Sequence, residues 1–193
     1  GLTLGGQQVA YSKICAQLEL LNLAIYTPSD FILPSCADKY ITTDEEGKAT
    51  NLSRSGRERG IRRLMCINML KRLESSVHSF RLTLQRLLDM HHDTLDKVSL
   101  VKQGEQAFVV QGNIDAEVDP DDLNDEVLVG GGRTTIDLRD MDYIAWEQYL
   151  ASDVAILREL ITQIEPITPD QDAKLQNLLS DIESKVAHPI NED

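Results

Sequence analysis

Apolar residues recur three and four positions apart through the run between residues 62 and 88, and they are Ile67, Leu70, Leu73, Val77, Phe80, Leu84 and Leu87. This spacing is typical of a helix that buries one face against other helices. No proline interrupts the pattern, so we expect the helix to begin at a Ser53 or Ser55 N-cap and to continue past His92 toward Lys102. Such a helix would span roughly 60 to 70 Å, which predicts a protruding hairpin rather than a compact ball.

A second apolar stripe predicts the partner of this long helix. Helical spacing returns around Asp137 or Asp140, and the stripe then comprises Tyr143, Trp146, Leu150, Val154, Leu157, Ile161 and Ile164. Because the two stripes complement each other, we expect the two helices to pack antiparallel. Burial of seven such side chains on each helix contributes roughly 1.5 to 3 kcal/mol apiece before chain entropy is subtracted.

Two more helices are expected near the ends of the chain. The first covers about residues 9 to 25, with apolar positions at helical spacing, and Pro28 follows its end. The last begins at a Thr168 cap and stops before Pro189.

The segments between these helices predict irregular structure. Residues 28–56 form a connector with a short helix near Asp38, and residues 104–136 form an irregular, acidic insertion in which 108–110 and 127–129 are candidates for short strands. We therefore expect an all-α fold: one helical domain over residues 1–193, built as a long antiparallel helical hairpin or bundle.

Charge is sorted along this chain. The net charge is −13, but nine basic and two acidic residues between Arg54 and Arg86 give that segment +7, so the remainder carries −20. This distribution favours a polyanionic or acidic partner. The alternative is a solvated helix face that acidic neighbours balance after folding.

The basic residues of the long helix are the candidate contact site. Three are expected opposite the apolar stripe, others flank it, and the set comprises Arg62, Arg63, Lys71, Arg72, Arg81 and Arg86. No catalytic constellation accompanies them.

Several other motifs suggest chemistry, and each has a simpler interpretation. Residues 115–126 carry carboxylates at the positions of a calcium loop, but Pro120 replaces its turn glycine, so a solvated loop is favoured. Adjacent His91 and His92 diverge on a helix, and we interpret them as surface or interfacial residues rather than metal ligands. The glycine run at 130–132 lacks the ending of a phosphate-binding loop, and Trp146 lies on the apolar stripe and is expected in the core.

Composition bounds the cellular context. The three cysteines have no metal-like spacing, so we expect reduced thiols rather than disulfides. No signal peptide or membrane span is apparent, which predicts a soluble, cytoplasmic protein with no membrane partner. Because Gly1 occupies the first position, we expect a segment of a larger chain.

One block of the sequence has a specific resemblance. Residues 64–76, LMCINMLKRLESS, continuing through 80–84, FRLTL, resemble the helical block between the two RecA-like motor lobes of bacterial Swi/Snf-type superfamily-two helicases. Residues 173–189 are similar, over a shorter stretch, to the segment that leads into the second lobe.

The resemblance implies a parent that is a DNA-dependent ATPase using ATP and Mg. The phosphate-binding Gly-Lys-Thr/Ser loop, the Asp-Glu-x-His box and the arginine finger are absent from residues 1–193, so no catalytic residue and no cofactor is expected in this segment. Its partners would be the motor lobes of the same chain and DNA. Lys71, Arg72 and Arg81, oriented by Glu74, would contact phosphates or pair with acidic groups of a lobe.

A free-standing helical adaptor whose basic face binds an acidic protein is the alternative function. A metal-dependent enzyme built on the acidic loop is disfavoured. The sequence leaves the oligomeric state open.

Overall fold

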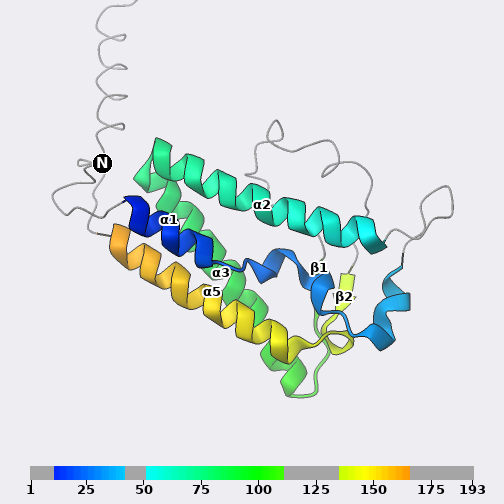
Figure 1. Ribbon diagram of the computed structural model, residues 1–193. Helices are drawn as coiled ribbons and strands as arrows, with labels where there is room; N and C mark the ends of the chain where they lie inside the picture. Colours follow the sequence, from blue (N-terminus) through cyan, green and yellow to red (C-terminus); the bar gives the residue numbers. More distant parts are fainter. Residues whose placement is uncertain (1–10, 42–50, 111–134, 166–193) are drawn as a thin grey trace, which may run out of the picture.

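The fold is an all-α bundle, as expected from the sequence. The computed structural model describes residues 11–41, 51–110 and 135–165 (Figure 1). Three long helices form its body: α2 (Asn51–Ser75), α3 (Val77–Lys102) and α5 (Tyr143–Ile164). The short helix α1 (Tyr11–Leu20) packs beside α5, and a two-stranded sheet lies at the end where α2 and α5 begin.

The predicted antiparallel pairing is confirmed for α3 and α5. Lys102, at the end of α3, donates to Glu147 near the start of α5 over 2.7 Å, whereas Arg81 near the start of α3 reaches Ile164 at the end of α5. Between these ends the two apolar stripes meet, and Phe80, Leu84, Leu150 and Leu157 are all completely buried.

The predicted single helix from 53 to 102 is wrong, because the chain reverses at Ser76. This residue has an extended backbone, with φ −157° and ψ 125°, and its hydroxyl accepts a hydrogen bond from the Ser79 amide as the N-cap of α3. The apolar spacing runs through the break because both helices turn their apolar faces to one core: Leu73 and Val77 are buried on either side of it. The result is a tight α2–α3 hairpin rather than a rod.

The reversal also changes which face of α2 is buried. Ile67 was expected in the stripe but is 40 % exposed. The buried row has a spacing of four residues, which places Ile67 on the opposite side of the helix. This row comprises Ile61, Met65, Met69 and Leu73.

The end of α3 agrees with the predicted break at residue 104. Gly104 has φ +87°, a left-handed conformation that costs glycine little. The Gly104 amide donates to the Val101 carbonyl and the Glu105 amide to the Leu100 carbonyl, each over 3.0 Å, which is a Schellman motif.

The strands are partly as predicted. The strand β1 (Phe108–Val110) is confirmed, and it pairs antiparallel with β2 (Thr135–Asp137), with Val109 opposite Ile136. The candidate strand at 127–129, the acidic loop at 115–126 and the expected helix at 168–189 lie outside the described residues.

Residues 21–41 form a strap across the bundle, between α2 and α5. It contains three 3₁₀ helices, η1 (Ala24–Tyr26), η2 (Pro28–Phe31) and η3 (Pro34–Tyr40). The last confirms the short helix expected near Asp38. The first helix ends at Leu20 rather than Ile25, because the backbone amides that follow are bound by a side chain of α5, as described below.

Candidate functional site

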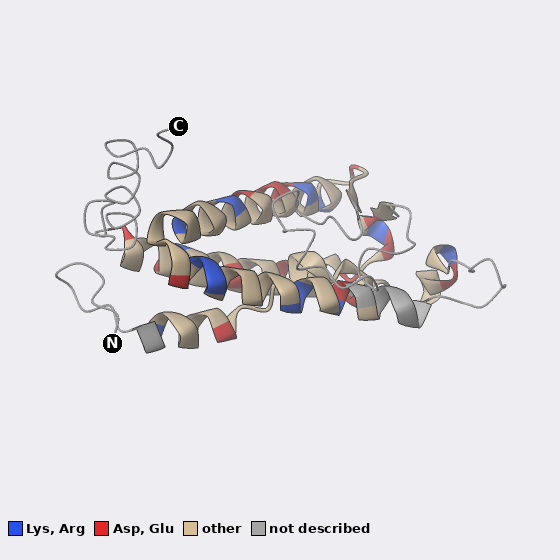
Figure 2. Cartoon of the chain, turned by 90° about the horizontal axis from the view of Figure 1, so that it is seen from above, with Lys and Arg blue, Asp and Glu red and all other residues tan. Residues whose placement is uncertain are grey.

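The outward face of α2 carries the exposed members of the basic set. Arg62, Arg63 and Lys71 are exposed, and Figure 2 shows Lys and Arg in blue along this helix. Arg59 is also exposed on α2, with 68 % of its side chain accessible, and lies 3.6 Å from the Asp30 carboxylate. Within the residues described, Arg62 and Arg63 form no ion pair. Both therefore remain available to an anionic partner.

Two other members of the set hold the bundle together. Arg72 donates to the Thr83 hydroxyl over 3.0 Å, which links α2 to α3 next to the reversal at Ser76. Arg81 donates to the Ile164 and Glu165 carbonyls over 2.7 and 3.3 Å, which satisfies free carbonyls at the end of α5. The block that resembles the Swi/Snf helicases thus includes the residues of a helix reversal.

The last member, Arg86, is half-buried on α3 and lies apart from the α2 face. The six predicted residues therefore divide into an exposed group on α2, two that form contacts between helices, and one that is half-buried.

Asp153 is a buried carboxylate outside the set of residues predicted from the sequence. It is completely buried on α5, and its oxygens accept from the backbone amides of Asn22 over 2.7 Å and Ala24 over 3.3 Å. Between these two amides, Leu23 adopts a left-handed conformation with φ 50°, so that both N–H groups point at one carboxylate. Asp153 thus fixes the start of the strap to α5.

His91 lies beside this carboxylate. It was expected at a surface or interface, but it is completely buried on α3. Its Nδ1 donates to the Leu87 carbonyl over 2.7 Å, and its Nε2, which makes no hydrogen bond, lies 3.6 Å from Asp153 Oδ2. His91 thus occupies the core between α3 and α5.

Glu58 plays a similar part on α2. It is 1 % exposed and accepts from the Ser29 amide and hydroxyl over 3.1 and 2.8 Å. The helical spacing of the sequence places both carboxylates on buried faces. Glu58 lies three positions from Ile61 on α2, and Asp153 lies three positions from Leu150 on α5.

A second group of charges fixes the far end of the strap. The Tyr40 hydroxyl donates to Asp140 over 2.7 Å and accepts from the Asp137 amide over 3.1 Å. Hydrogen bonds from the Arg139 side chain lower the pKa of Asp137 to about 2, and those from Tyr40 and Lys39 lower the pKa of Asp140. Burial raises the pKa of Tyr40, and its hydrogen bond to Asp140 raises it further.

The half-buried Cys66 on α2 has no sign of an activated nucleophile. Burial raises the pKa of its thiol, and the nearby Arg62 offsets this only in part. This cysteine is therefore expected to remain a protonated thiol at neutral pH.

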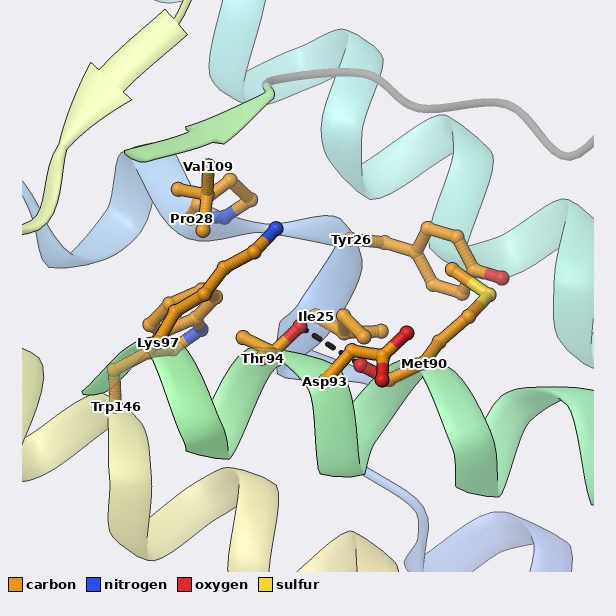
Figure 3. A pocket seen from close by; sticks show the side chains of 9 residues that line it. All are labelled: Ile25, Tyr26, Pro28, Met90, Asp93, Thr94, Lys97, Val109 and Trp146. Atoms are coloured by element: carbon orange, nitrogen blue, oxygen red, sulfur yellow. Dashed lines mark hydrogen bonds between the residues drawn. The ribbon is translucent and has the colours of Figure 1, made fainter. Parts of the chain in front are cut away.

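A pocket of about 170 Å³ opens between the strap and α3 (Figure 3). Buried Trp146 forms part of its wall, with the indole fixed by a 2.8 Å hydrogen bond to the Ala24 carbonyl, so its place in the core is confirmed. Two exposed charged residues of α3, Asp93 and Lys97, stand at the rim. The other lining residues are Ile25, Tyr26, Pro28, Met90, Thr94 and Val109.

Comparisons with known proteins identify no relative: no family model, no curated protein and no solved structure matches this chain. In the part of the chain that the structure describes, no group of three or more histidine, cysteine or acidic side chains is placed to hold a metal ion. A search of the same residues finds no helix whose length and apolar character would let it cross a membrane.

Proposed function

We propose that this chain is a non-catalytic helical segment between the motor lobes of a Swi/Snf-type ATP-dependent DNA translocase, and that the outward face of α2 contacts DNA phosphates. On this proposal ATP and Mg belong to the lobes of the parent protein. The observation that carries the DNA contact is the exposure of Arg62 and Arg63 on α2, whereas Arg72 of the same helix is used inside the bundle.

The arrangement of the helices supports a place between two lobes. The start of α1 and the end of α5 lie at the same end of the bundle, close to the α2–α3 reversal (Figure 1). A domain whose chain enters and leaves at neighbouring points can be accommodated within a larger protein without separating the parts it joins.

The spacing of the α2 charges supports a phosphate contact. Arg63 and Lys71 are eight positions apart, which is roughly 12 Å along the helix axis and little more than two full turns, so both lie on the outward side of α2. One strand of duplex DNA carries a charge about every 3.4 Å along its axis, so this face spans about three to four phosphates. Glu74 is the exposed acidic residue near the end of this face.

One observation favours the alternative, an adaptor that binds an acidic protein. Ile67 is 40 % exposed and lies one helical turn from Arg63 on the same face. An exposed apolar side chain beside arginines is common in protein interfaces. We rank this second because the charged residues outnumber the apolar ones there.

Binding of a fluorescent duplex of mixed sequence by the 193-residue chain, measured across salt concentration, separates these functions. We expect weak binding that falls as salt rises, and the double variant R62A/R63A should reduce the slope of log K against log salt by about 2. The matched control K13A/R158A removes two exposed charges from α1 and α5 and should leave the slope unchanged. Absence of binding at about 50 mM salt, or an equal effect of the two double variants, would refute the DNA contact.

A further inference from the structure

The pocket beside Trp146 has the size of one apolar side chain. An apolar cavity of ~150 Å³ accommodates benzene, and this pocket measures about 170 Å³. The wall residues Trp146, Val109 and Tyr26 are at most 7 % exposed and come from α5, β1 and the strap. The elements around the pocket are held by the hydrogen bonds of Asp153 and of the Trp146 indole, and these contacts set its shape.

Two opposite charges at the rim are not used by the fold. Asp93 and Lys97 are four residues apart on α3, the spacing at which helix ion pairs form. Within the described residues, however, neither side chain forms an ion pair or a hydrogen bond. Figure 3 shows Lys97 extending over the pocket toward Pro28 and Val109 and away from Asp93.

A carboxylate and an ammonium group from successive turns of α3, at the rim of a pocket lined by Trp146 and Met90, match the three parts of one class of ligand. Lys97 attracts an anion, Asp93 attracts a cation, and the wall of the pocket accepts an apolar group that extends away from both charges. A ligand with only one charge would leave the other rim residue without a partner. A free α-amino acid with an apolar side chain carries both charges on one carbon atom.

We propose that this pocket binds a free α-amino acid with an apolar side chain, such as leucine or methionine. Its carboxylate pairs with Lys97, its ammonium group pairs with Asp93, and its side chain contacts Trp146 and Met90. Arg62 and Arg63 do not line this pocket, so the inference is independent of the proposed function.

Isothermal titration of the 193-residue chain with L-leucine tests the proposal. Leucinamide lacks the carboxylate, 4-methylpentanoate lacks the ammonium group, and glycine lacks the side chain. Each should bind at least about tenfold more weakly than leucine, a difference of about 1.4 kcal/mol.

Variants assign the two charges. D93N should weaken leucine binding and bring it close to that of 4-methylpentanoate, whereas K97M should bring it close to that of leucinamide. The control D96N alters an exposed carboxylate of α3 outside the pocket and should leave binding unchanged. Because Asp93 and Lys97 are exposed, far-UV circular dichroism should show all three variants folded.

Three results would overturn the proposal. These are no heat of binding with leucine up to about 10 mM, equal binding of leucine and its singly charged analogues, or a loss in D96N as large as that in D93N.

Discussion

Replacement of Asp153 tests whether one buried carboxylate fixes the strap to the bundle. In D153N one oxygen remains to accept from the Asn22 amide, but an NH₂ group replaces the oxygen that accepts from Ala24, so the buried Ala24 amide loses its acceptor. A hydrogen bond to a charged group contributes about 1.5 to 3 kcal/mol, and a buried donor without an acceptor costs about 1 to 3 kcal/mol. We expect D153N to lower the free energy of unfolding by about 2 kcal/mol.

D153A should cost more, because it leaves both backbone amides without their acceptor. Removing one member of a buried charged group typically costs about 3 to 5 kcal/mol. This is a large part of the ~5 to 15 kcal/mol that stabilises a typical domain. Urea unfolding followed by circular dichroism at 222 nm measures both variants, and E159Q, on the exposed side of α5, is the control.

The loss of stability in D153N should begin at the strap. Amide hydrogen exchange of Asn22 and Ala24 should accelerate in D153N before exchange in the middle of α5 does, because the strap loses its attachment first. A D153N variant with wild-type stability and unchanged exchange at these two amides would refute the role assigned to the carboxylate.

Two further predictions concern the hairpin and the end of the strap. F80A removes a completely buried side chain and should cost about 3 to 5 kcal/mol in urea unfolding, whereas L82A, at a position 57 % exposed, should change stability by less than about 0.5 kcal/mol; similar losses in both would contradict the placement of α3. The pKa of Asp137 is about 2 in the folded protein, below its ordinary 3.8, so its contribution is present above pH 4 and is lost as the pH falls toward 2. Because 53 % of the Arg139 side chain is exposed, we expect this contribution to be about 1 kcal/mol. Acid titration of stability should therefore be shallower in D137N than in the wild type, and identical titration curves would contradict it.

The sequence predicted the helical faces well where the packing is between neighbouring helices. The stripes of α3 and α5 were found because 3.6-residue periodicity is a local property that survives folding. The break at Ser76 was missed for the same reason: Leu73, Val77 and Phe80 keep helical spacing across it, although one extended residue reverses the chain.

Periodicity places Glu58 and Asp153 on the buried faces of their helices, but it does not identify the groups that they bind. Asp153 binds amides that precede it by 131 and 129 residues, and no local pattern records such a partner. Among the candidate contact residues, the sequence identified the charged side chains but not which of them bind other helices of the bundle. Arg81 and Arg72 have the same chemistry as Arg62, and only the folded chain shows which of them meet other helices.

The chain has a single tryptophan, and its position gives the protein an intrinsic spectroscopic reporter. Trp146 lines the pocket and donates to the strap, whereas the arginines of α2 do not contribute to that pocket. Its emission should therefore respond to an amino acid in the pocket or to release of the strap. Occupation of the α2 face by an anion should leave the same emission unaltered, so one spectrum distinguishes events at the two surfaces.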